Sequence, residues 1–276
     1  MEANNCAYFS SLLKTDYPKI YRAIVDVLER HSIKHGLLKN TRDYWCRDYM
    51  PVQSRIHEFI QFVYHPDYLE KQREYETDIT TVFENAQAFT GIAPTPSHLI
   101  ADGGNFTFCE SREGKPVIVM TEKIFSENPS CSREEVISEL RSLFHQSEIL
   151  FLPWDRMDKC GHTDGTLHYI GDGKILVNLN VYSKRIANQM RERLESKFDI
   201  VDLQISDFHK YSWAYINLLE VGDVIIVPGL GLPTDQEARN QIKGLFINHD
   251  VCQINIFDIV KKWGGALNCL SCTIRM

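Results

Sequence analysis

Residues 132–154 read SREEVISELRSLFHQSEILFLPW, and this stretch contains one complete helix and the strand that follows it. Ser132 and Glu135 have the spacing of a capping box, which predicts that a helix begins at residue 132. Apolar residues then recur at helical spacing and form one face of the expected helix: Val136, Ile137, Leu140, Leu143 and Phe144. The apolar run Ile149–Trp154 is short and is typical of a buried strand.

The same pattern occurs five times along the chain. The expected helices begin near residues 16, 78, 132, 183 and 234, at intervals of 62, 54, 51 and 51 residues. Their further N-terminal signals are Asp16 with Pro18 in the first turn, Ser183, and a second capping box of Thr234 and Glu237. The other apolar stripes are Ile20, Ile24, Val27 and Leu28; Ile79, Val82, Phe83 and Ala86; Ile186, Met190 and Leu194; and Ala238, Ile242, Leu245 and Phe246.

A short apolar run follows each helix and predicts a strand. Besides the run quoted above, these are Gly36–Leu38, His98–Ala101, Ile200–Ile205 and Val251–Phe257, and the pair Asp172-Gly173 predicts a hairpin. Neither terminal unit looks like a polar cap, so a closed ring is favoured over an open array. The sequence therefore predicts one α/β domain over residues 1–276, with five helix-plus-strands modules around a pseudo-fivefold axis.

The composition narrows the class of protein. The 276 residues are 43% hydrophobic and 24% charged, with a formal charge of -7 that argues against a nucleic-acid partner. The apolar runs are far too short for a membrane span, and the start of the chain does not resemble a signal peptide. Eight cysteines in such a chain are typical of reduced thiols. We expect a cytoplasmic protein without membrane or nucleic-acid partners, and the oligomeric state stays open, a homo-oligomer included.

One polar cluster comes after the expected strand of each module. The clusters are WCRDYMP (45–51), DGGN (102–105), GHTDG (161–165), YIN (215–217) and GGALNC (264–269). Their most reactive or polar members are separated by 54, 60, 55 and 52 residues: Asp48, Asp102, His162, Asn217 and Cys269. Because these separations match the module length, the side chains are expected to meet in one pocket of a closed ring.

The residue types in this set indicate a cationic substrate. A cysteine and a histidine supply a nucleophile and a proton carrier. The carboxylates of Asp48, Asp102 and Asp164 disfavour a nearby thiolate unless a cation joins it. A planar guanidinium or amidinium pairs with carboxylates in bidentate fashion, and the Trp45 ring offers it an aromatic face.

In this order, the five motifs and the run VIIVP (224–228) resemble the agmatine deiminase and bacterial peptidylarginine deiminase family of the guanidino-group-modifying superfamily, the penteins. The similarity extends from about Asp16 to the C-terminus. It implies a five-bladed α/β propeller. Two positions depart from the family pattern: Asn268 replaces a common histidine before the cysteine, and Asp102 stands where related enzymes often have glutamate.

The resemblance also implies roles for the residues. Cys269 matches the nucleophile, His162 the general acid/base, and Asp102 the acid that orients the histidine. The matched substrate-binding residues are Asp48, Asp164, Trp45 and Asn217. Arg47 is expected to bridge carboxylates beneath the pocket, with structural support from Gly103, Gly104, Asn105, Gly264 and Gly265.

The implied function is a cysteine hydrolase that deiminates a guanidinium substrate to a ureido product and ammonia, without a cofactor. An agmatine-like small molecule is favoured. Peptidyl-arginine deimination and amidino transfer are alternatives within the same chemistry. A catalytically silent protein that binds a cationic ligand or a protein is the alternative from another class.

Taken singly, the motifs are also typical of other structures. Cys160, His162, Cys269 and Cys272 together suggest zinc or redox chemistry, but the two pairs lie 107 residues apart and match no compact zinc module, so no metal is expected. Cys269 alone is typical of a buried small hydrophobe, and residues 102–105 alone of a turn. Alternation along an extended segment places His162 and Asp164 on one face, which suits a shared pocket.

Overall fold

The computed structural model describes residues 4–85, 89 and 91–276. Within these residues the strands form five sheets of three strands each. The sheets are β15-β1-β2 (Ser271–Ile274, Cys6–Ser10, Lys34–Leu38), β3-β4-β5 (Val52–Arg55, Glu58–Val63, Thr95–Ile100), β6-β7-β8 (Thr107–Glu110, Pro116–Thr121, Glu148–Leu152), β9-β10-β11 (Leu167–Gly171, Lys174–Val177, Asp199–Asp202) and β12-β13-β14 (Leu219–Val221, Val224–Gly229, Asp250–Asn255).

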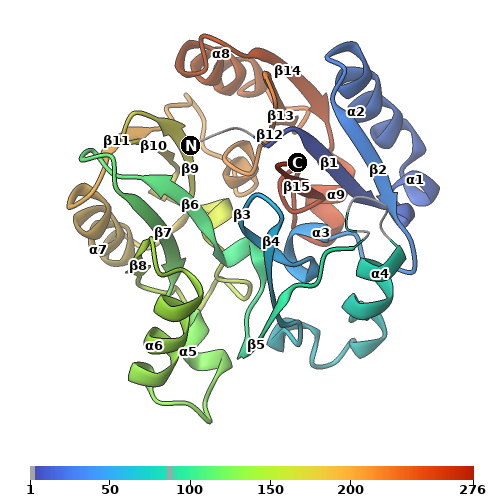
Figure 1. Cartoon of the computed structure of the whole chain (residues 1–276). Helices are drawn as coiled ribbons and strands as arrows, with labels where there is room; N and C mark the ends of the chain where they lie inside the picture. Colours follow the sequence, from blue (N-terminus) through green and yellow to red (C-terminus); the bar gives the residue numbers. More distant parts are fainter. Residues whose placement is uncertain (1–3, 86–88, 90) are drawn as a thin grey trace.

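All five sheets have the same topology. In each sheet the middle strand pairs antiparallel with one neighbour and parallel with the other. The chain between the middle and third strands of each sheet contains a helix that lies on the outside of the ring in Figure 1: α2 (Pro18–Arg30), α4 (Ile79–Asn85), α6 (Arg133–Leu143), α7 (Lys184–Glu195) and α8 (Asp235–Leu245). The remaining α-helices are α1 (Ser11–Asp16), α3 (Cys46–Tyr49), α5 (Lys123–Glu127) and α9 (Phe257–Trp263).

The ring closes between the two ends of the chain. Strand β15 pairs with β1, so the last strand completes the sheet that the first strand begins. The largest apolar cluster joins the sheet β15-β1-β2 to the sheet β12-β13-β14, with Phe9 of β1 and Val227 of β13 fully buried in it. This closure agrees with the predicted ring. Each sheet, however, combines the hairpin of one predicted module with the helix and strand of the next, so the structural unit is out of phase with the sequence unit.

All five predicted helices are present, but two of the predicted caps are wrong. Ser132 and Glu135 form the capping box of α6, and the Ser183 side chain caps α7. Asp16 does not cap α2, because it ends the short helix α1 and accepts a hydrogen bond from Tyr44. Ala86 of the second predicted stripe lies outside the described residues.

The second predicted capping box is absent because residues of other segments bind both of its side chains. Thr234 has helical backbone angles, and its hydroxyl pairs with the Tyr215 hydroxyl at 3.0 Å. The Glu237 carboxylate instead accepts hydrogen bonds from the backbone and hydroxyl of Ser206. Asp235 fixes the preceding turn by accepting from the Leu230 amide. Among the described residues, no helix is both long and apolar enough to cross a bilayer.

Candidate active site

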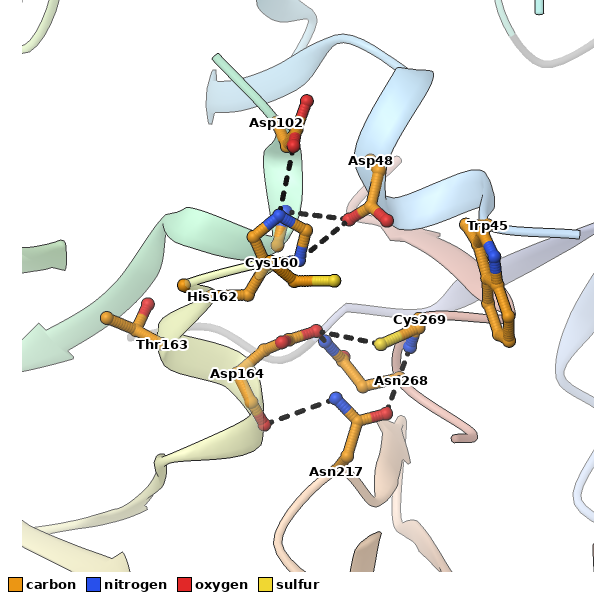
Figure 2. A network of polar contacts seen from close by, with 12 residues as sticks. Trp45, Asp48, Asp102, Cys160, His162, Thr163, Asp164, Asn217, Asn268 and Cys269 are labelled. Carbon is orange, nitrogen blue, oxygen red and sulfur yellow. Dashed lines mark hydrogen bonds and ion pairs between the residues drawn. The ribbon is translucent and has the colours of Figure 1, made fainter. Parts of the chain in front are cut away.

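Short helical turns carry the five polar clusters to the centre of the ring. Figure 2 shows the predicted residues of all five clusters around a common space. The cavity has a volume of about 1120 Å³ and is lined by Trp45, Asp48, His162, Asp164, Asn217, Gly264, Gly265 and Cys269. Asp102 lies behind His162 and is only 1% exposed. The predicted convergence is therefore present in the structure.

His162 lies between two carboxylates. Its Nε2 is 3.0 Å from Oδ2 of Asp102, and its Nδ1 is 3.5 Å from Oδ1 of Asp48. The segment is not extended as predicted, because residues Thr163–Gly165 form the 3₁₀ turn η5. The turn nevertheless directs both His162 and Asp164 into the cavity.

The charges around His162 favour its protonated form. Burial alone lowers the pKa of His162, but the Asp48 charge and the hydrogen bond to Asp102 outweigh it and raise the pKa to about 10. Burial also raises the pKa of the Asp48 carboxyl well above its ordinary value; His162 opposes this effect, and the Asp102 carboxylate adds to it. At neutral pH the imidazolium is thus a proton donor that faces the cavity through Nδ1.

Cys269 lies in an environment that resists a thiolate while the site holds no cation. Its Sγ is 3.5 Å from Oδ2 of Asp164, and its backbone amide donates to Oδ1 of Asn217. Burial and the Asp164 and Asp48 carboxylates raise the pKa of the thiol well above its ordinary value. A cation between these carboxylates would reverse the electrostatic part of that shift.

Two asparagines connect the modules around Cys269. Asn217 donates through Nδ2 to the backbone oxygen of Asp164, at 3.2 Å. Asn268 donates through Nδ2 to Oδ2 of Asp164, at 2.7 Å. The sequence marked Asn268 only as a departure from a family pattern, and no spacing rule assigns it this contact.

The glycines of the motifs permit close approach of the chains. A Cβ on Gly104 would lie 2.5 Å from Nδ1 of His162, and the Gly104 amide donates to Asp48. A Cβ on Gly265 would overlap the Trp45 ring, and one on Gly103 would overlap the backbone oxygen of Arg47. These three positions therefore require glycine if the site is to keep its shape.

The other supporting residues have specific contacts. Asn105 accepts from the Thr121 amide at 2.7 Å and thereby fixes its turn to β7. Gly264 ends α9 in the left-handed conformation, with φ of 80°. Arg47 does not bridge carboxylates as predicted: its Nη2 donates to Oδ1 of Asn268 and to Oγ1 of Thr273.

A cluster that the sequence did not reveal supports the histidine from outside. The Tyr68 ring lies edge-on to His162, with 6.2 Å between centroids, and Nζ of Lys123 lies 5.2 Å from the centre of the Tyr68 ring. Buried Lys123 forms ion pairs of 2.9 Å with Asp67 and Glu127. Burial raises the pKa of Glu127 to about 7, with Asp102 adding to the effect and Lys123 opposing it. Asp67 and Tyr68 lie in the 3₁₀ turn η1 (Asp67–Leu69), Lys123 and Glu127 lie in α5, and the two segments share no motif with His162.

The four candidate zinc ligands do not all line one cavity. Cys160, His162 and Cys269 line the main cavity, whereas Cys272 lines a second cavity of about 590 Å³. Over the described part of the chain, His, Cys, Asp and Glu side chains form no group of three or more with the arrangement of a metal site. The eight cysteines, all of them described, are unpaired thiols.

Solved structures share this fold over nearly the whole chain. C. jejuni agmatine deiminase has a TM-score of 0.77 at 16% identity, with 99% of this chain and 94% of that chain covered. Agmatine deiminase of Enterococcus faecalis has a TM-score of 0.69 at 16% identity, with 99% and 93% covered. An amidinotransferase of the saxitoxin pathway from Microseira wollei has a TM-score of 0.62 at 15% identity, with 99% and 95% covered. These similarities confirm the predicted pentein fold.

Sequence comparison gives the family. No curated protein is significantly similar to the chain in sequence. The family model of the Porphyromonas-type peptidyl-arginine deiminases matches residues 19–274. Because this match covers almost the whole chain, and the five motifs lie within it, the protein belongs to the Porphyromonas-type peptidyl-arginine deiminase family.

Proposed function

We propose that this protein is a guanidino-modifying enzyme that deiminates a small guanidinium substrate, with agmatine as the favoured class. The observation that carries the proposal is the meeting of Cys269 and His162 with the carboxylates of Asp48 and Asp164 in one cavity. Family membership supports the same chemistry. The 276 residues form one domain in this proposal, since β15 and β1 share a sheet. The proposed location is the cytoplasm.

The first step is recognition of the cation. The guanidinium nitrogens pair with Asp48 and Asp164, and the Trp45 ring contacts the face of the cation. The positive charge lowers the pKa of the Cys269 thiol, whose proton leaves to solvent. The enzyme thus forms its nucleophile only when the correct charge is bound.

Covalent chemistry then follows. The Cys269 thiolate adds to the guanidinium carbon, and protonated His162 donates through Nδ1 to the departing nitrogen, which leaves as ammonia. The C–N bond breaks and a thiouronium intermediate remains on Cys269. Neutral His162 next takes a proton from water, and the oxygen adds to the same carbon. Cleavage of the C–S bond, with loss of the remaining hydroxyl proton to solvent, releases the neutral ureido product and restores the thiolate.

The cavity size favours one second candidate. A volume of about 1120 Å³ is above the usual range of 300–1,000 Å³ for ligand pockets, so an arginyl side chain on a peptide also has room. Its rim has both signs of charge, with Asp155 and Asp158 as well as Lys261 and Lys262. Peptidyl-arginine deimination is therefore the second candidate.

A substrate panel tests the proposal. Agmatine, arginine, methylated arginines and an arginyl peptide are each incubated with the protein, and both ammonia and the ureido product are measured. Cys269→Ala is expected to abolish both products, and Cys131→Ala, a change of a peripheral thiol, is expected to retain them. Turnover by the Cys269→Ala variant would overturn the mechanism. No turnover of any panel member would favour a binding protein.

A further inference from the structure

Asn268 lies between the half-buried Arg47 guanidinium and the Asp164 carboxylate of the cavity wall. Its Nδ2 donates to Oδ2 of Asp164 at 2.7 Å, and its Oδ1 accepts from Nη2 of Arg47 at 3.2 Å. Arg47 is itself held by Thr273, whose Oγ1 accepts from the same Nη2 at 2.8 Å. These contacts form a chain from Arg47 through Asn268 to Asp164.

The chemistry of Arg47 fixes the orientation of the Asn268 amide. A guanidinium only donates hydrogen bonds, so the amide oxygen of Asn268 must face Arg47 and the amide nitrogen must face Asp164. The backbone of Asn268 is also fixed, because its N–H donates to the Asn217 oxygen and its C=O accepts from Ser271. The Asn268 side chain therefore has one orientation, and it presents a donor to Asp164.

The position of Asp164 makes this contact important. Asp164 lines both the main cavity and the second cavity, whereas Arg47 and Asn268 line only the second. Its Oδ2 receives the Asn268 amide and is also the oxygen that Cys269 Sγ approaches. A neutral amide holds this carboxylate in place without cancelling its charge. Direct pairing of Asp164 with Arg47 would neutralise the carboxylate charge before a cation binds.

We infer that Asn268 is a positioning residue that orients the Asp164 carboxylate toward the cationic group in the main cavity, with Arg47 setting the direction of the Asn268 amide. The inference rests on the proposed function to the extent that Asp164 grips a guanidinium or amidinium. Asn268 acts through Asp164 and does not itself touch the reacting atoms.

Two alkylating probes test the inference without relying on turnover. The rate at which 2-chloroacetamidine, a cation, labels Cys269 is divided by the rate for neutral iodoacetamide. Asn268→Leu retains the approximate size of the side chain but removes the donor without adding a charge, and Asn268→Ala removes the whole amide. Both are expected to lower this ratio by about 10- to 100-fold, the range for a hydrogen bond to a charged group. Asn240→Ala, a change of an exposed amide in α8 that accepts from Gln236, is the control and keeps the ratio.

Turnover provides a second readout. With a substrate from the panel, both Asn268 variants are expected to raise KM more than they lower kcat, because cation binding is what Asp164 provides. Arg47→Met is expected to lower the labelling ratio in the wild-type background and to have little further effect in the Asn268→Ala background. Such non-additivity is the signature of a chain that runs through Asn268.

The outcomes separate this inference from the proposed function. If no guanidine is turned over but the labelling ratio falls in both Asn268 variants, the function fails and the positioning role stands. If guanidines are turned over and the ratio and KM stay at wild-type values in both variants, the positioning role is wrong. Equal loss of labelling by both probes, with a lowered melting temperature, would show general damage and would also overturn it.

Discussion

Nε2 of His162 lies 3.0 Å from a carboxylate oxygen of Asp102, although the two residues are 60 positions apart and belong to neighbouring modules. Asp102 is almost completely buried, so this bond is shielded from water. It fixes the imidazole ring with the opposite nitrogen, Nδ1, toward Asp48 and the cavity. Asp102 thereby controls the proton that His162 would pass to a substrate.

Asp102→Asn tests this control. The variant retains the shape of the side chain but removes its charge, while the burial of His162 stays the same. The pKa of His162 is therefore expected to fall from its value of about 10 by at least about 1 unit. NMR titration of the imidazole ring measures the change. Asp172→Asn, in an exposed turn that tolerates asparagine, is the control. An unchanged titration of His162 in Asp102→Asn would contradict the prediction.

The raised pKa of His162 also predicts how stability depends on pH. The folded state binds the His162 proton more tightly than the unfolded state, whose histidine has a pKa of about 6.5. The resulting stabilisation is full below that value and is lost as the pH rises to about 10. Thermal unfolding of the wild type and His162→Gln between pH 6 and 10 should show a difference in Tm that shrinks as the pH rises. A difference that grows with pH would have the wrong sign.

The repeated part of the fold was predictable because it depends on local patterns. The stripe of Ile186, Met190 and Leu194 is buried as the helical period requires, and Ser183 caps the same helix. The absence of the predicted Thr234 cap could not be foreseen, because the Glu237 carboxylate accepts a hydrogen bond from Ser206 of a different segment. A cap motif indicates which hydrogen bonds can form, but side chains from distant segments can bind the same groups and prevent the cap.

The site divides in the same way. The positions of Cys269 and His162 in the repeat predicted that they would meet, since a closed ring brings equivalent positions to its centre. Lys123 and Tyr68 were not predictable, because no spacing relates them to His162. The contact of Asn268 with Asp164 depends on side-chain directions that a sequence period does not specify.

Gly265→Ala is expected to impair activity while the fold remains. The added Cβ would overlap the six-membered ring of Trp45, so the indole must move out of its place in the cavity wall. The expected result is a lower kcat/KM with cooperative unfolding retained. Gly244→Ala is the matched control: its Cβ meets open space in α8, and the loss of a helical glycine should stabilise the protein by about 0.5–1 kcal/mol. Wild-type kcat/KM in Gly265→Ala would argue against a role for Trp45.

Lys123→Met is expected to destabilise the protein by about 3–5 kcal/mol, because it leaves the buried Glu127 carboxylate without its cation. The side chains of Lys123 and Glu127 are 1% and 4% exposed. Urea unfolding measures the loss, and the double change Lys123→Met with Glu127→Gln should recover part of it, since no uncompensated charge remains. Lys115→Met removes the exposed partner of Glu113 and should change the stability much less, because solvent screens this surface pair. If Lys123→Met costs no more than Lys115→Met, this cluster does not stabilise the wall behind His162.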